Sequence, residues 1–143
     1  MFIGEYNYLI DSKNRLGLPV KFRKQLLSGA VVTRGLESCL FLFPQKEWKK
    51  LASNISKMPI SKAKNRAFGR LMLAGAMETK VDKQGRISLP DYLKKYADLK
   101  KKVVVAGVYD RLEIWDETKW KKYKQESEKD SSEIAEALEG LGI

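Results

Sequence analysis

The chain contains an internal repeat, which constrains its fold more than any other feature. Residues 11–19 (DSKNRLGLP) return as residues 82–90 (DKQGRISLP), 71 positions further along the chain. The echo continues downstream, where Val31 matches Val103 at a displacement of 72. Each copy spans about fifty residues, too few to bury a generous core alone. We therefore expect the two halves to build one pseudo-symmetric structure that presents two equivalent loops.

The composition limits the classes of function. The 143 residues are 43% hydrophobic and 32% charged, which is typical of one globular domain. There is no histidine, so the usual general base and the commonest metal ligand are missing. The single cysteine, Cys39, cannot form an internal disulfide, and no apolar run is long enough for a membrane span. We expect a cytoplasmic protein that is not an enzyme and has no metal, cofactor, small-molecule substrate or membrane partner.

Charge is distributed unevenly along the chain. The net charge is +10, yet residues 125–143 carry six acidic residues and one lysine, so residues 1–124 carry +15. A basic body with an acidic tail suggests a polyanionic partner, with nucleic acid as the first candidate. The alternative is that the excess lysine only keeps the protein in solution.

Apolar spacing and turn residues predict an α+β fold in which each half is a β-hairpin, a helix, a β-hairpin and a helix. In the first half we expect a strand at 6–10 with its return strand at 16–18, followed by a helix that begins at Pro19 and ends at Gly29. We then expect a hairpin of residues 31–33 and 40–43 with its turn at Glu37-Ser38, and a helix after Pro44. In the second half Asp116 is the expected N-cap of the last long helix. Between the halves, Ser61 is the expected cap of a connecting helix that runs to Gly75.

The repeated Asp-x-x-x-Arg turns have a clear local chemistry. Asp11 and Asp82 can accept backbone N–H groups within their turns, and each aspartate can pair with the arginine four residues on. The residue before the arginine is Asn14 in one copy and Gly85 in the other, and both types tolerate positive φ. The turns can therefore fold back sharply and restrict the arginine side chains.

Two interpretations of these turns remain. In one, the ion pairs only pin their hairpins, since exposed pairs are common and individually weak. In the other, Arg15 and Arg86 read guanine O6 and N7 in the major groove, while Lys13 and Lys83 contact phosphates. Because the motif is duplicated and both loop tips are cationic, we favour the second interpretation.

Aromatic residues also recur, and we expect them to be packing residues. Trp48 corresponds to Trp120, and Phe43 corresponds to Trp115. Base stacking is conceivable for such side chains. A symmetric pair of tryptophans behind apolar strands is more typical of a core.

Several motifs together resemble the MraZ family of bacterial transcriptional regulators over residues 1–124. They are the opening Met-Phe-Ile-Gly, the two Asp-x-x-x-Arg turns, Leu-Phe-Leu-Phe-Pro at 40–44 with Glu47-Trp48, Arg-Leu-Met-Leu-Ala-Gly-Ala at 70–76 with Glu78, and Glu-Ile-Trp at 113–115 followed by Trp120.

This resemblance implies a swapped-hairpin β-barrel formed by two tandem SpoVT/AbrB-like halves with flanking helices. The implied segments are a first half (5–47), connecting helices (48–75), a second half (76–119) and a C-terminal helix with an acidic tail (120–143). It also implies ring-shaped homo-oligomers that bind G-rich direct repeats in double-stranded DNA and typically repress their own cell-division and cell-wall gene cluster. Such a protein would be associated with the nucleoid.

The family resemblance assigns roles to the turn residues. It makes Arg15 and Arg86 the principal DNA contacts and Asp11 and Asp82 their organisers. Family members usually have glycine before both arginines, so Asn14 is a departure, although asparagine tolerates the same backbone conformation.

Other classes of function stay open. An RNA- or ribosome-associated basic protein would have the same charge. An antitoxin-like module is a third hypothesis, because AbrB-type folds also occur there, although the long tandem arrangement argues against it.

Overall fold

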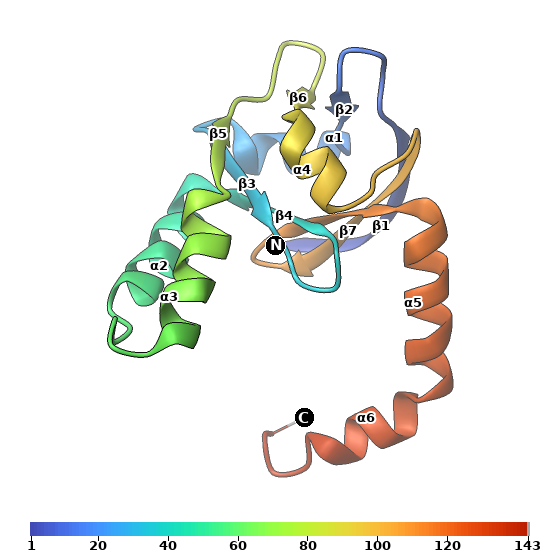
Figure 1. Ribbon diagram of the computed structural model, residues 1–143. Helices are drawn as coiled ribbons and strands as arrows, with labels where there is room; N and C mark the ends of the chain where they lie inside the picture. Colours follow the sequence, from blue (N-terminus) through green and yellow to red (C-terminus); the bar gives the residue numbers. More distant parts are fainter. Residues whose placement is uncertain (143) are drawn as a thin grey trace.

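The computed structural model describes residues 1–142, and Figure 1 shows the arrangement of its elements. The strands are β1 (Phe2–Leu9), β2 (Arg15–Gly17), β3 (Ala30–Arg34), β4 (Leu40–Pro44), β5 (Met77–Thr79), β6 (Arg86–Ser88), β7 (Lys102–Tyr109) and β8 (Leu112–Asp116). The helices are α1 (Val20–Arg23), α2 (Gln45–Ser56), α3 (Ala63–Gly69), α4 (Asp91–Tyr96), α5 (Glu117–Lys129) and α6 (Ser131–Ala137), with a 3₁₀ turn η1 (Lys24–Leu26) and a π-helical turn η2 (Arg70–Ala74). The fold is mixed α+β, as predicted.

The strands of the two halves interleave. A six-stranded antiparallel sheet has the order β1-β7-β8-β4-β3-β5, and β2 pairs with β6 in a second, two-stranded sheet. Strand β1 pairs with β7, β3 with β5 and β4 with β8, so most of these ladders join the first half to the second. Neither half has a sheet of its own, which agrees with the expectation that the two repeats build one structure.

The first predicted hairpin differs from the observed one. Residues 6–10 and 16–18 were expected to pair with each other, but only an isolated bridge joins Ile10 to Leu16. Strand β2 instead pairs with β6, where Leu16 lies opposite Ile87 and both side chains are buried. The prediction was wrong because the crossing of β2 and β6 buries Leu16 against Ile87, a contact that a local hairpin would not make.

The predicted barrel is not confirmed. Among the described residues the large sheet is open, with β1 and β5 at its edges. The second predicted hairpin is confirmed, since β3 pairs with β4 throughout and both Glu37 and Ser38 have positive φ at its turn. The segment boundaries expected from the family resemblance stay a prediction.

In strands β3 and β7 the structural equivalence of the two halves is shifted by one residue from the sequence match. Ala30 pairs with Pro44 and with Thr79, and Val103 occupies the equivalent place in the second half, opposite Asp116 and Tyr8. Residues 30–34 and 103–107 share one burial pattern, four buried positions and one half-buried. The match of Val31 with Val103 was therefore wrong by one position. Because strand side chains alternate between faces, a one-residue slip would turn every side chain over.

One hydrophobic core unites the halves. Most of its buried residues form pairs related by the repeat: Leu16 and Ile87, Leu18 and Leu89, Phe22 and Leu93, Leu26 and Ala97, Val32 and Val105, Leu40 and Leu112, and Leu42 and Ile114. Since each half contributes one member of every pair, neither half holds a complete core.

A second, aromatic cluster lies under the long helices. Phe43 packs on Trp48 with ring centroids 5.9 Å apart, and Trp115 packs on Trp120 at 5.4 Å. These aromatic residues join Phe41, Ile55 and Met72 in the cluster. The prediction that the repeated aromatics are packing residues is confirmed.

Helix starts were mostly predicted correctly. Helix α2 follows Pro44, and the Asp116 carboxylate caps α5 by accepting from the backbone N–H groups of Thr118 (3.1 Å) and Lys119 (3.4 Å). The first helix is shorter than expected: four residues of α1 continue as η1, and Gly29, at φ +108°, ends the segment.

The connecting helix differs in two ways from the prediction. It begins after Lys62, not at Ser61, and it has no side-chain cap. It also widens into the π-helical turn η2 before Gly75. At this turn the Thr33 hydroxyl donates to the Met72 carbonyl at 2.7 Å, a bond from strand β3 that the helix sequence does not specify.

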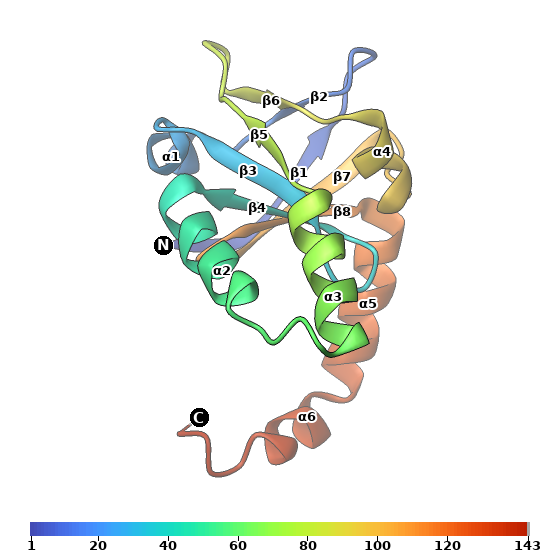
Figure 2. The same ribbon diagram turned by 60° about the vertical axis from the view of Figure 1, so that its left-hand side comes forward.

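Residues 131–142, which follow α5, lie apart from the sheets (Figure 2). Helix α5 packs on the sheet through Trp115, whereas every residue from 131 to 142 is exposed. Residue 143, the last of the predicted tail, lies outside the described residues. In the part of the chain that the structure describes, no helix is long and apolar enough to cross a membrane.

Candidate nucleic-acid interface

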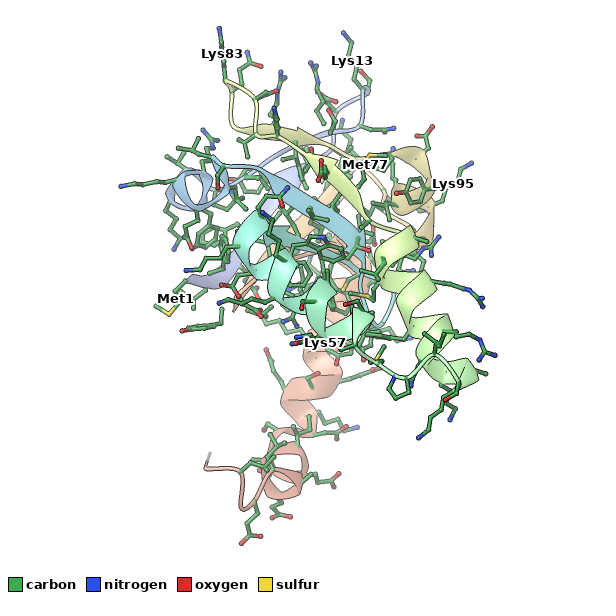
Figure 3. All side chains as sticks on the ribbon, turned by 90° about the vertical axis from the view of Figure 1, so that its left-hand side faces the viewer. Met1, Lys13, Lys57, Met77, Lys83 and Lys95 are labelled. Atoms are coloured by element: carbon green, nitrogen blue, oxygen red, sulfur yellow. The ribbon has the colours of Figure 1, made fainter. Side chains whose placement is uncertain are left out.

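The two Asp-x-x-x-Arg turns project side by side from one end of the molecule. Strands β2 and β6, which follow the turns, pair with each other, so Arg15 lies opposite Ser88 and Arg86 opposite Gly17. Figure 3 shows Lys13 and Lys83 reaching outward from this end, and both side chains are exposed. The antiparallel pairing therefore brings residues 71 positions apart in sequence to one surface.

The first turn is organised around the Asp11 carboxylate. One oxygen, Oδ1, accepts from the backbone N–H groups of Lys13 and Arg15, both at 2.9 Å. The other, Oδ2, accepts from Arg15 Nε at 2.7 Å. Asn14 has φ +57°, and its N–H donates to the Asp11 carbonyl at 3.0 Å. The carboxylate thus fixes both the backbone of the turn and the arginine side chain.

The second turn repeats this geometry. Asp82 accepts from the N–H groups of Gln84 and Arg86 at 2.9 Å and from Arg86 Nε at 2.9 Å. Gly85, at the position equivalent to Asn14, has the left-handed backbone conformation, with φ +76°. The predicted Asp–Arg pairs and the predicted positive φ are both confirmed as local geometry.

These carboxylates are held in their ionised form. The pKa values of Asp11 and Asp82 are lowered above all by the hydrogen bond from the backbone N–H of the arginine four residues on. Desolvation opposes this shift, and the hydrogen bond from the arginine side chain lowers the pKa further. Each arginine uses Nε in its ion pair. Its terminal Nη groups donate to no protein acceptor within residues 1–142, so they are free for bidentate hydrogen bonds to an external ligand.

Each turn is braced by the opposite half of the chain. At the first turn, Asn14 Nδ2 donates to Asp91 Oδ1 at 2.7 Å, and Lys94 Nζ donates to Asn14 Oδ1 at 3.0 Å. Both Asp91 and Lys94 belong to α4. Asn14, which stands where the second turn has Gly85, is therefore held by its side chain.

At the second turn the brace is Arg23, at the end of α1. Its Nε donates to the Leu18 carbonyl at 3.0 Å, and its guanidinium covers Gly85 so closely that a Cβ there would collide with it. Sequence reasoning missed Arg23 and Lys94. Both are basic and stand 71 positions apart, so the displacement that relates the two turns could have found them.

The surface beside the first turn is also cationic. A recess of about 740 Å³ lies there, and its lining includes Lys94, Lys100 and Lys101. Of these ammonium groups, Lys94 donates to Asn14 and Lys100 pairs with Asp98 at 2.8 Å. Within residues 1–142 there is no cluster of three or more His, Cys, Asp or Glu side chains that could hold a metal ion.

The fold and the repeated turns define a class of protein: a mixed α+β chain built from two interleaved tandem halves that present paired arginine turns. The family model described as "MraZ protein, putative antitoxin-like" matches residues 1–71 and again residues 72–140. The chain belongs to the MraZ family.

Curated relatives match along the whole length of the chain. A protein of Natranaerobius thermophilus is 49% identical over 143 residues, and proteins of Halothermothrix orenii and Pediococcus pentosaceus are each 46% identical over 143 residues. In each case 100% of both chains is covered, and each relative is named "Transcriptional regulator MraZ".

Proposed function

We propose that the protein is a sequence-specific DNA-binding transcriptional regulator. The observation that carries the proposal is the pair of arginines that identical carboxylate contacts hold at one end of the molecule. The names of the relatives support regulation of transcription. Arg15 and Arg86 would contact guanine edges in the major groove, and Lys13 and Lys83 would contact phosphates.

The rigid carboxylate contacts favour base readout over a general attraction to polyanions. Holding Nε in a short ion pair restricts the side chain before binding, so less conformational freedom is lost on the DNA. Asp11 and Asp82 are then the organisers of the site, and Asn14 and Gly85 supply the left-handed backbone that it needs.

The proposed assembly is a ring of copies that binds G-rich direct repeats, and the proposed effect is repression of the cell-division and cell-wall gene cluster that contains its own gene. Direct repeats match copies arranged head to tail better than a two-fold dimer. Tethering several weak contacts raises the overall affinity by roughly 10²–10⁴-fold.

An RNA-associated role is less well supported. Sequence-specific RNA readers stack unpaired bases on exposed aromatic side chains. Here Trp48, Trp115 and Trp120 belong to the second cluster, under the long helices. The turns, by contrast, offer hydrogen-bond donors suited to a duplex groove.

The decisive experiment compares the wild type with Arg15→Ala/Arg86→Ala on a tandem G-rich duplex and on a shuffled duplex, at two salt concentrations. We expect the wild type to prefer the tandem duplex and the variant to lose that preference, since a bidentate guanine contact contributes about 1–3 kcal/mol. The matched control, Lys13→Ala/Lys83→Ala, should weaken binding to both duplexes and reduce the salt dependence. Circular dichroism confirms that each variant folds. Equal binding of all proteins to both duplexes would contradict the proposal, and displacement by structured RNA would favour the alternative.

A further inference from the structure

The face formed by α2, α3 and η2 carries an open apolar groove. Its volume is about 400 Å³, and its lining includes Ile55, Met58, Ile60 and Leu73. Of these, Ile60 is 80% exposed and Leu73 is 38% exposed. Exposed apolar side chains gathered in one groove indicate a surface that binds another polypeptide.

The rim of this groove is cationic. Between Glu47 and Glu78 the chain has no acidic residue, whereas it has five lysines and two arginines. Arg66 and Arg70 lie in the groove lining itself, and neither pairs with a carboxylate within residues 1–142. A suitable occupant is therefore an apolar segment flanked by carboxylates.

The acidic tail of the same chain has this chemistry. Ile134, Leu138 and Leu141 are spaced by four and three residues, so a helix extended to Leu141 would place them along one side. In the structure α6 ends at Ala137. Glu133 precedes these three apolar residues, and Glu136 and Glu139 lie between them. All these side chains are exposed, and a helix as short as α6 has little stability without packing. The segment thus has an apolar face without a partner.

The tail does not reach its own groove, whose lining contains no residue of 131–142. Helix α5 is fixed to the body by Trp115, whose ring lies 5.0 Å from that of Tyr123, and by an ion pair of 2.9 Å between Lys124 and Glu5. In Figures 1 and 2 the segment after α5 hangs beneath the molecule, apart from α2 and α3 and at the end opposite the arginine turns.

We propose that residues 131–142 of one copy dock in the α2–α3 groove of a second copy. Ile134, Leu138 and Leu141 fill the groove, and the glutamates face Arg66 and Arg70. Such a contact joins different surfaces of two copies, so its repetition produces a ring when the rotation closes. The inference rests on the proposed function for the role of that ring, and it leaves both arginine turns free for DNA.

Cysteine cross-linking distinguishes a neighbouring copy from the same chain. Full-length Leu73→Cys and Ile134→Cys variants, carrying tags of different size, are mixed and treated with a short bis-maleimide. We expect a covalent product that contains both tags. Cys39 is present in every protein, but burial raises the pKa of its thiol and keeps it unreactive. The control pairs Val20→Cys, which is 73% exposed on α1, with Ile134→Cys.

Two results would overturn the proposal. The first is no product above that of the control pair. The second is a cross-link within one chain, seen when Leu73→Cys/Ile134→Cys is made as a double variant and treated alone. In that case the tail would bind its own groove.

Charge reversal supplies an independent test by light scattering. Arg66→Glu/Arg70→Glu should reduce the size of the assembly, and adding Glu133→Lys/Glu136→Lys should restore it. Lower duplex binding by Arg66→Glu/Arg70→Glu with no change in assembly would mean that the groove binds nucleic acid, which contradicts the proposal. Arg15→Ala/Arg86→Ala should lose DNA preference and keep the tail cross-link, so failure of one proposal is separable from failure of the other.

Discussion

At the scale of single residues, the two arginine turns have the same backbone geometry although the residue before the arginine differs. Gly85 needs no side chain, because Arg23 from the opposite half fills the space above it. Asn14 fills that space itself and is held by Asp91 and Lys94. The repeat therefore preserves the positions of Asp and Arg while the left-handed residue and its brace differ together.

Substitution of Gly85 by alanine should show this coupling. The residue has φ +76°, so alanine should cost about 1–2 kcal/mol of folding free energy for the left-handed backbone, and its Cβ would also displace Arg23. In an Arg23→Ala background only the backbone cost should remain. Urea unfolding of the four proteins gives the coupling directly, and strict additivity would contradict the close packing of Arg23 on Gly85.

The turn carboxylates should make stability depend on acid. Their pKa values lie below the usual 3.8 in the folded chain, so their contribution is full above pH 3.8 and is lost as the pH falls through the lower, folded value. Between about pH 5 and about pH 3, Asp11→Asn/Asp82→Asn should therefore lose less unfolding free energy than the wild type. Denaturant titrations at several pH values measure both slopes, and equal slopes would show that the carboxylates do not support the fold.

At the scale of elements, the close approach of strands β1 and β7 depends on Gly107. It lies opposite Gly4, and a Cβ at Gly107 would meet the backbone of Phe2 and Ile3 at 2.5–2.6 Å. Backbone atoms cannot move aside as a flexible side chain can. This ladder is the longest between the halves, so its spacing affects the whole sheet.

Gly107→Ala should therefore destabilise the protein by about 1–3 kcal/mol, the usual cost of overpacking. The matched control is Gly69→Ala in α3, where the nearest atom would be Ile55 Cγ2 at 3.8 Å. There alanine should stabilise the helix by about 0.5–1 kcal/mol. Thermal unfolding measures both effects, and a neutral Gly107→Ala would mean that β1 does not lie so close to β7 in solution.

At the scale of the whole molecule, the interleaved strands make the two repeats one folding unit. Leu16 and Ile87 are fully buried and lie opposite each other in the β2–β6 ladder. Strands of the two halves pair with each other, so removing a core side chain from one half should destabilise both halves. The repeat in sequence is thus not a pair of separable domains in space.

Leu16→Ala and Ile87→Ala should each cost about 2–5 kcal/mol and lower the midpoint of a single unfolding transition. Scanning calorimetry and tryptophan fluorescence should report the same midpoint in each variant. Two separate transitions would show instead that the halves fold independently.

Features that depend on neighbouring residues could be predicted from the order of the amino acids. The Asp–Arg turns, the left-handed positions at Asn14 and Gly85, and the Asp116 cap form within three or four residues, so local spacing was sufficient to predict them. Arg23 and Lys94, which brace the two turns, are also 71 positions apart, but their contacts with the turns are seen only in the structure.

Strand pairing and register depend on contacts between residues far apart in the chain, and they could not be predicted from local patterns. The sequence predicted that residues 16–18 return on 6–10, and it aligned Val31 with Val103, yet β2 pairs with β6 and Ala30 is the equivalent of Val103. Apolar strands of similar composition are compatible with several partners. Only the simultaneous burial of both halves in one core selects among them, and that selection places both arginines on one surface.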